Sequence, residues 1–539
     1  MTADAENEAD ETAAPADDPQ AEAIRLLEDP STHDGHPVRR IDTHASLVFL
    51  TPERAYKLKR AVAYPYLDFG TLEKRRDAVA AELRLNRRTA PDIYLGARPV
   101  VRGDDGAPAL GARQPDGPDP AGVAGPVLDW LVELKRFDEA GLMDRVAADG
   151  RLDAVTVDRL ADAVAGLHAR AEPAERSGGA DSLGVVIDEN AGQLAEFPDL
   201  FSPDEVAALT RQSRTALEAV RGLMDRRAAA GWVRRCHGDL HLGNVVLIDG
   251  QPTLFDAIEF NREIAEIDTL FDLAFLLMDL DRRGLRWAAN RLLNRYYRTR
   301  GDLDALAALP LCLSLRAGIR AHVAATARAT QSDPDSRAAK AAEARDLFAA
   351  ARGYLDPAPA RLVAVGGLSG SGKTTIARRV APEIGRPPGA LLVRSDVERK
   401  RLFGVAETER LPERAYRGKV NADVYRAMLD RAAAALSAGQ SAIVEATFLD
   451  RSSRADARKT AEAAGVPFQA VWLSAPEETL KTRVDARTGD ASDATSDVVD
   501  GQLTRAPRGA IAWPEVDAAD TPDAVSDRVL AALGPPESG

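Results

Sequence analysis

The chain has 539 residues, with 70 Lys and Arg against 84 Asp and Glu and a net charge of −14. Its length predicts about three to four structural units. The acidic balance gives no electrostatic support for a nucleic-acid partner. Only two cysteines occur, Cys236 and Cys312, which excludes a disulfide framework and fits a reducing compartment.

The hydropathy pattern bears on targeting and on membrane insertion. No basic-then-apolar signal pattern stands at the N-terminus, and the apolar stretch at residues 270–278 is too short and too acidic to span a bilayer. We therefore expect a soluble cytoplasmic protein with no membrane partner. Residues 1–20 are mainly Ala, Asp, Glu and Pro, which predicts a disordered acidic tail.

The first ordered region predicts a β-hairpin. Residues 46–50 and 55–59 are β-type runs on either side of a short turn. Lys57 and Lys59 share one face of the returning strand because side chains alternate along a strand. Taken alone, they could be two solvated lysines on an edge strand. A charged helix follows at residues 72–88 and contains Glu82.

A second region has the spacing H-G-D-x-H-x-x-N from His237 to Asn244, with Asp239 as its aspartate. Two short strands joined at Asp249-Gly250 come next, and Asp256 follows the second strand. Such a hairpin brings Asp256 back beside Asn244. Carboxylate and amide oxygens suit Mg²⁺, and a remaining carboxylate can accept a hydroxyl proton. The alternative is a polar hairpin with capping Asp and Asn residues.

Residues 40–330 resemble the aminoglycoside phosphotransferase family, a branch of the protein-kinase-like fold. The resemblance implies that Asp239 is the catalytic base and that Asn244 and Asp256 hold metal. It also implies a phosphate-contacting lysine at Lys57, with Lys59 a close rival and Glu82 its helix partner. Residues 132–134 would be the hinge that binds adenine, and Asp268 and Asp272 would be structural. No G-x-G-x-x-G loop precedes Lys57, so the covering of the nucleotide phosphates in this region stays open.

The third region begins after a linker. Residues 356–360 contain Asp-Pro-Ala-Pro, and an apolar run at residues 362–365 then predicts a buried strand. A G-x-x-x-x-G-K-[ST] loop and a helical pattern follow, which is the order that a P-loop requires. Its backbone N–H groups would face phosphate oxygens, Lys373 would reach the β- and γ-phosphates, and Thr374 would ligate Mg²⁺. The nucleotide-binding loop comprises Gly367, Leu368, Ser369, Gly370, Ser371, Gly372, Lys373, Thr374 and Thr375.

Alternating strands and helices continue to residue 533 and predict a parallel sheet with helices on both faces. Asp396 follows the second strand, where open α/β sheets bind ligands, so we expect it to contact the acceptor. The alternative is that Asp396 caps a helix beginning at Val397. Glu445 ends the third strand. Arg483 and Arg487 share a helix face, and residues 489–494 form a polar loop that predicts a mobile lid.

Residues 361–533 resemble small P-loop kinases akin to gluconate kinase and zeta-toxin-type kinases. In that comparison Asp396 handles the acceptor, and Arg483 and Arg487 clamp the transferred phosphate. Where the family often has Asp at the end of the third strand this chain has Glu445, so a direct metal role there stays open.

The expected fold is α/β and α+β in two domains: a bilobal protein-kinase-like domain, then a P-loop parallel sheet. We place a tail at residues 1–20, the kinase-like domain at 21–355, a linker at 356–360 and the P-loop kinase domain at 361–535. The expected function is ATP- and Mg²⁺-dependent phosphoryl transfer to a hydroxyl of a small, sugar-like or aminoglycoside-like molecule. Alternatively, one domain is a nucleotide-binding regulator or a P-loop ATPase without an acceptor.

Overall fold

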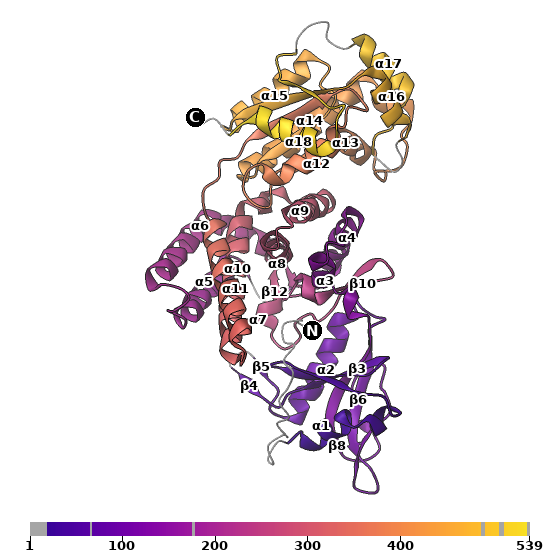
Figure 1. Ribbon diagram of the computed structural model, residues 1–539, viewed down its shortest axis with the longest axis vertical. Helices are drawn as coiled ribbons and strands as arrows, with labels where there is room; N and C mark the ends of the chain where they lie inside the picture. Colours follow the sequence, from indigo (N-terminus) through magenta and orange to yellow (C-terminus); the bar gives the residue numbers. More distant parts are fainter. Residues whose placement is uncertain (1–18, 65–66, 175–177, 487–490, 506–510, 536–539) are drawn as a thin grey trace. The chain divides into compact units, whose positions relative to one another are not determined.

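The computed structural model describes residues 19–64, 67–174, 178–486, 491–505 and 511–535 (Figure 1). Contacts divide the chain into two compact units. Unit 1 comprises Met1–Gly179 and Asp225–Leu276, and unit 2 comprises Ala180–Met224 and Leu277–Gly539. Each unit holds one of the two motif regions. The domain boundaries expected from the sequence stay predictions.

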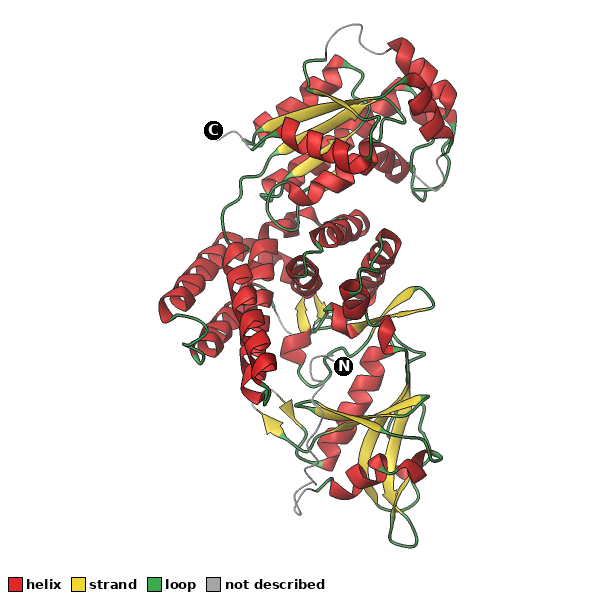
Figure 2. Ribbon diagram, viewed as in Figure 1, coloured by secondary structure: helices red, strands yellow, loops and turns green. Residues whose placement is uncertain are grey.

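Unit 1 contains a six-stranded antiparallel sheet in the order β1-β2-β3-β8-β6-β7 (Figure 2). Because side chains alternate along β2, Leu47 and Phe49 pack with helix α1 while Val48 and Leu50 pack with helix α2. The sheet is therefore covered by one helix on each face. Its strands are β1 (Arg39–Asp42), β2 (Ser46–Leu50), β3 (Arg54–Lys59), β6 (Tyr94–Arg102), β7 (Pro108–Leu110) and β8 (Val127–Lys135), and its helices are α1 (Ala21–Glu28) and α2 (Leu72–Asn86).

The rest of unit 1 is a helical region with three two-stranded sheets. Together with the antiparallel sheet, it forms the kinase-like arrangement that the sequence predicts. The strand pairs are β4 (Ala63–Tyr64) with β5 (Leu67–Asp68), β9 (Val233–Arg235) with β12 (Glu266–Asp268), and β10 (Val245–Ile248) with β11 (Gln251–Leu254). The helices are α3 (Met143–Ala148), α4 (Ala154–Arg170) and α7 (Arg262–Ala265).

Two long helices, α6 (Pro203–Ala229) and α8 (Thr269–Arg282), contain residues of both units. The helices of unit 2 that precede its sheet are α5 (Ala180–Ala195), α9 (Arg286–Arg300), α10 (Leu309–Thr330) and α11 (Pro334–Gly353). One stretch among the described residues, Leu303–Thr330, is long and apolar enough to cross a membrane. It is 67% buried over its most apolar window, as a core helix is.

The second half of unit 2 is a five-stranded parallel sheet in the order β14-β15-β13-β16-β17. Helices α12 and α18 share a buried apolar cluster with β13 and β16, and α14 and α15 pack on β15 and β16. This confirms the predicted parallel sheet. Its strands are β13 (Leu362–Gly367), β14 (Leu391–Arg394), β15 (Ala442–Glu445), β16 (Phe468–Ser474) and β17 (Glu515–Asp517). Its helices are α12 (Lys373–Val380), α13 (Ser395–Leu402), α14 (Gly418–Ser437), α15 (Arg451–Ala463), α16 (Glu477–Asp485), α17 (Ser496–Arg505) and α18 (Pro522–Leu533).

Candidate active sites

The first site is built around Lys57 on β3. Its Nζ donates to Oε1 of Glu82 on α2 at 3.0 Å and to Oδ1 of Asp256 at 2.5 Å. Burial alone would lower the pKa of Lys57, but the carboxylates of Asp256 and Glu82 outweigh it and hold that pKa well above its usual value. The same contact works on Asp256 in reverse: burial would raise its pKa, yet Lys57 holds it well below the ordinary range. Both groups are therefore charged.

Lys59 lies on the same strand face but has a different environment. Its side chain is 2% exposed, and its Nζ forms ion pairs with Glu82 and with Glu259, whose side chain is 4% exposed. Lys59 is therefore more deeply buried than Lys57, and Lys57 is the lysine that contacts Asp256. Glu259 was not predicted from the sequence; its only signal is its position three residues after Asp256 in a region that already contained a site.

Asp239 and Asn244 lie together in the loop before β10. Asn244 Nδ2 donates to Oδ2 of Asp239 at 2.8 Å and to its backbone carbonyl at 2.9 Å. The carbonyl of Asn244 accepts from the N–H of Phe255 at 3.0 Å, which places Asp256 next in the chain beside this loop. Asp256 has φ of +61°, a left-handed backbone conformation that is uncommon for a non-glycine residue. The hairpin thus brings the backbone at Asp256 beside the loop in which Asp239 and Asn244 are bonded to each other.

A buried aspartate on α8 braces this loop. Asp272 accepts backbone N–H bonds from His237 at 3.1 Å and Gly238 at 2.9 Å, and its Oδ2 lies 3.0 Å from Nε2 of His168. These contacts are consistent with the structural role expected for Asp272. Cys236 adds a third possible ligand atom within 4.8 Å of those of His168 and Asp272, but Asp272 already serves the loop backbone.

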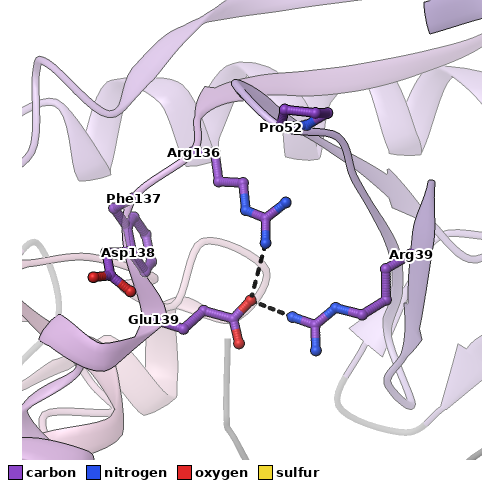
Figure 3. Close-up of a pocket in the computed structure, with 6 residues that line it drawn as sticks. All are labelled: Arg39, Pro52, Arg136, Phe137, Asp138 and Glu139. Atoms are coloured by element: carbon purple, nitrogen blue, oxygen red, sulfur yellow. Dashed lines mark hydrogen bonds and ion pairs between the residues drawn. The ribbon is translucent and has the colours of Figure 1, made fainter. Parts of the chain in front are cut away.

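The hinge expected at residues 132–134 is wrong. These residues lie inside β8, where Val132 pairs with Lys57 of β3 on one side and with Ala97 of β6 on the other. A strand paired on both sides has no free backbone groups for a base. The chain leaves the sheet only after Lys135, beside a cavity of about 470 Å³. In this cavity Arg136 and Arg39 both reach Glu139 (Figure 3).

The second site begins at the loop between β13 and α12. Gly367, Gly370 and Gly372 all have positive φ, between 84° and 142°. A Cβ on Gly370 would lie 2.3 Å from the carbonyl oxygen of Leu480, so only glycine fits there. Lys373 Nζ donates to the carbonyl of Leu368 at 2.8 Å. Its side chain therefore folds back over the phosphate-binding loop.

Thr374, Arg394 and Glu445 form a closed triangle beside this loop. Thr374 Oγ1 donates to Oε2 of Glu445 at 3.0 Å, and Arg394 Nη2 donates to the threonine oxygen at 3.0 Å. Arg394 Nε donates to the same carboxylate oxygen at 3.0 Å. The register of β14 and β15 pairs Arg394 directly with Glu445. Arg394 was not predicted as a site residue, because one arginine at a strand end carries no motif.

Asp396 lines a cavity of about 1070 Å³ together with Lys373, Thr374 and Glu445. Burial, and then the negative charge of Glu445, raise its pKa above the ordinary value. Its alternative role as a helix cap is wrong: α13 begins at Ser395, its N-cap position is Arg394, and no side chain caps it. Asp396 therefore lies inside the first helical turn and faces the cavity.

Of the two arginines expected to clamp the transferred phosphate, the structure describes Arg483. Arg483 donates to the carbonyls of Ala518 at 2.8 Å and Ala519 at 3.3 Å. Its Nη1 lies 3.9 Å from the place where a Cβ of Gly372 would be, so it is near the phosphate loop. Arg487 lies outside the described residues, as do residues 489 and 490 of the expected lid.

Other residues of the cavity were missed by sequence reasoning. Arg399 is 6% exposed, its guanidinium lies 4.8 Å from the ring centre of Tyr416, and its buried Nε has no hydrogen-bond partner among the described residues. Gln502 on α17 accepts from the N–H of Ser369 at 2.8 Å and donates to its hydroxyl at 3.0 Å. Arg399 belongs to a run of three basic residues, 399–401, shortly after Asp396, and this run was its only signal in the sequence. Nothing singled out Gln502.

Comparison with known proteins gives matches to both halves of the chain. A family model described as "AAA domain" matches residues 362–508, which supports the P-loop assignment. Among solved structures, a gluconokinase from Sinorhizobium meliloti is 25% identical and covers 32% of this chain and 91% of its own, with a TM-score of 0.24. A choline/ethanolamine kinase family protein from Mesorhizobium loti is 15% identical and covers 62% of this chain and 99% of its own, with a TM-score of 0.36.

One relative matches nearly the whole chain. It is "Uncharacterized protein Rv2004c" of Mycobacterium tuberculosis, 31% identical over 486 residues, which are 87% of this chain and 91% of the relative. A protein of Mycobacterium bovis, "Uncharacterized protein Mb2027c", matches over the same extent. The match spans both the H-G-D region and the P-loop, and the chain belongs to the family of these mycobacterial proteins.

Proposed function

We propose that the chain is an ATP-dependent phosphotransferase with two nucleotide sites, each moving the γ-phosphoryl group of ATP to a hydroxyl of a small molecule. The observation that carries this is the cavity in unit 2, where Lys373 and Thr374 of the phosphate loop share one space with Asp396. Its volume of about 1070 Å³ is enough for a nucleotide and a small acceptor together.

In unit 2 the roles follow from position. Lys373, with the backbone of the loop, would neutralise the β- and γ-phosphates, and Arg483 and Arg487 would approach the transferred group. Asp396 would accept the hydroxyl proton as the oxygen attacks the γ-phosphorus and the bond to the β-phosphate oxygen breaks, which releases ADP. Thr374 would offer its hydroxyl oxygen to Mg²⁺, and the ion would neutralise phosphate charge. The buried Nε of Arg399, which has no hydrogen-bond partner in the described part of the chain, suits an acceptor rich in oxygens, such as a sugar-like molecule.

In unit 1 the polar set suits the same reaction. Lys57, oriented by Glu82, would contact nucleotide phosphates, and Asp239 would take the acceptor proton. Asn244 and Asp256 present oxygen donors of the type that Mg²⁺ prefers, and their hairpin holds them side by side. The base of the nucleotide would reach the backbone of residues 136–138, after β8 ends, rather than that of residues 132–134.

Two other functions remain as outcomes of experiment. One unit could bind nucleotide as a regulator, or the P-loop could hydrolyse ATP without an acceptor. The complete set of Asp239, Asn244 and Asp256 favours catalysis in unit 1. The presence of Asp396 beside the phosphate loop favours transfer to an acceptor over hydrolysis in unit 2, because the shared cavity of about 1070 Å³ has room for an acceptor beside the nucleotide. We place this chemistry in the cytoplasm, where ATP is present.

The test follows the phosphoryl group. The full chain, Asp239→Asn, Lys373→Ala and the double variant are each incubated with ATP and a panel of sugars, aminoglycosides and amino alcohols, with products read by mass spectrometry. Two active sites predict two product classes, each lost in one single variant. Free phosphate without a phosphorylated acceptor would show an ATPase instead, and one product class would leave the other unit as a regulator.

A further inference from the structure

The guanidinium group of Arg394 occupies the corner between the hydroxyl of Thr374 in the P-loop and the carboxylate of Glu445 at the end of β15. Arg394 and Glu445 are paired neighbours in the register of β14 and β15, and the side chain of Arg394 is 2% exposed. Its guanidinium bonds both Glu445 and Thr374 at 3.0 Å. Each of the two groups that would otherwise turn toward a metal ion therefore has an arginine contact.

Counting charges shows what this arrangement does. Thr374 is neutral, and Glu445 and Arg394 cancel, so the corner carries no net charge to attract a divalent ion. Asp396 lies in α13, the helix that follows β14. Glu445 disfavours the charged form of its carboxyl group, and Arg394 favours that form. Without the guanidinium, Glu445 and Asp396 would form an acidic pair beside a hydroxyl, which is an oxygen donor set suited to Mg²⁺ or Mn²⁺.

We propose that Arg394 is an internal counter-cation that keeps Glu445 from ligating metal directly, so that a divalent ion reaches Thr374 only together with nucleotide. Arg394 is a positioning residue: it acts through Glu445 and Thr374. The inference rests on the proposed nucleotide site of unit 2. It explains why Glu, with a longer side chain than Asp, ends β15, because the carboxylate reaches the arginine and the threonine hydroxyl at once.

The test measures metal binding without nucleotide, in the full chain. All variants carry Asp256→Ala, which removes the proposed metal ligand of unit 1. Mn²⁺ binding is followed by calorimetry for the otherwise unchanged chain and for Arg394→Met. We expect Arg394→Met to gain a Mn²⁺ site at least about tenfold tighter than any in its parent, and Arg394→Met with Glu445→Gln to lose it again. No gain in Arg394→Met, or tight binding in the parent, would overturn the proposal.

Arg431→Met is the matched control. Arg431 is a largely buried arginine of the same unit whose Nε lies 3.1 Å from Glu398, so its loss also leaves a buried acid with one partner fewer. It lies on α14 and pairs with Glu398 rather than with Glu445, so its loss should create no metal site. A gain there equal to that in Arg394→Met would make the effect a general one of removing arginine, and would overturn the proposal.

A second measurement covers the case in which Arg394→Met does not fold. Arg394→Gln with Glu445→Gln removes both charges together, so the corner stays neutral while the carboxylate is lost. If Glu445 does not ligate metal, the ratio of ATP affinities with and without Mg²⁺ stays within about threefold of the wild-type ratio; a larger fall would overturn the proposal. ATP binding to the wild type is recorded in parallel. Its absence at the P-loop site would refute the proposed function, whereas a changed ratio with ATP bound would refute only the role of Arg394.

Discussion

Asn294 on α9 accepts a hydrogen bond from the backbone N–H of Leu392 at 2.7 Å and donates to the carbonyl of Ala390 at 3.2 Å. Asn290, one turn earlier, donates to the same carbonyl at 3.0 Å. β14 is an edge strand of the parallel sheet, so these asparagines satisfy backbone groups that would otherwise be unpaired. Helix α9, which precedes the expected linker, therefore hydrogen-bonds the edge strand of the parallel sheet that follows the linker.

We predict that Asn294→Ala loosens β14. The backbone N–H of Leu392 loses its partner, whereas the carbonyl of Ala390 keeps Asn290, so one group is left unsatisfied at a cost of about 1–3 kcal/mol. Hydrogen exchange at Leu392 is the measurement, because it reports the strand locally even if the whole chain does not unfold in one step. Thr326→Ala is the control: that exposed hydroxyl bonds only its own helix. Unchanged exchange at Leu392 would show that the strand needs no help from α9.

The second prediction separates the two lysines of β3. Lys57→Ala should abolish transfer in unit 1 at a modest cost in stability, because the side chain of Asp256 is 22% exposed and Glu82 retains Lys59. Lys59→Ala leaves Glu259 buried and unpaired, so it should destabilise unit 1 by about 3–5 kcal/mol. Chemical denaturation and a phosphoryl-transfer assay on both variants decide this. The reverse pattern would make Lys59 the phosphate-contacting residue.

Much of this could be read from the sequence, for a physical reason. The P-loop region and the H-G-D hairpin are local motifs: the residues that meet are within about 20 positions, so spacing alone places them. β6, in contrast, was missed, because Gly96 and Pro99 are rare in strands and only its pairing with β8 keeps it extended.

Contacts across long sequence separations were also out of reach. Arg394 and Glu445 are 51 positions apart, and Asn294 and Leu392 are 98 apart. An arginine at a strand end or an asparagine in a helix is compatible with a solvated surface, so no pattern marks them. The hinge was placed too early for a related reason: residues 132–134 look like a strand end until both neighbouring strands are known.

The third prediction separates base from metal ligand in unit 1. Asp239→Asn retains the shape of the side chain and its bond with Asn244 but removes the proton acceptor, so turnover should fall by about two to four decades with little change in ATP affinity. Asp256→Ala should instead weaken binding of ATP with Mg²⁺, because it deletes a metal ligand and a partner of Lys57. Equilibrium nucleotide binding and turnover are measured on both; the same defect in each would remove the division of roles.

The fourth prediction concerns pH and Asp396. A base must be ionised to act, and burial together with Glu445 raises the pKa of Asp396. Transfer in unit 2 should therefore be lost as pH falls through that raised value, at a higher pH than for an ordinary aspartate at about 3.9. Asp396→Asn should lower turnover by about two to four decades and remove this acid limb. The pH profile is recorded in an Asp239→Asn background, so that unit 1 contributes nothing.

The raised pKa of Asp396 also predicts how the stability of the fold changes with pH. An acid whose pKa is raised on folding binds its proton more tightly in the folded state, so its contribution is greatest at low pH and declines as pH rises through the folded value. Above that pH the charged Asp396 opposes folding, and Asp396→Asn should melt at or above the wild-type temperature while losing activity. Asp450→Asn, which changes another carboxylate of the same cavity, should leave the acid limb in place. If Asp396→Asn instead transfers phosphate at near-normal rates, Glu445 becomes the candidate base.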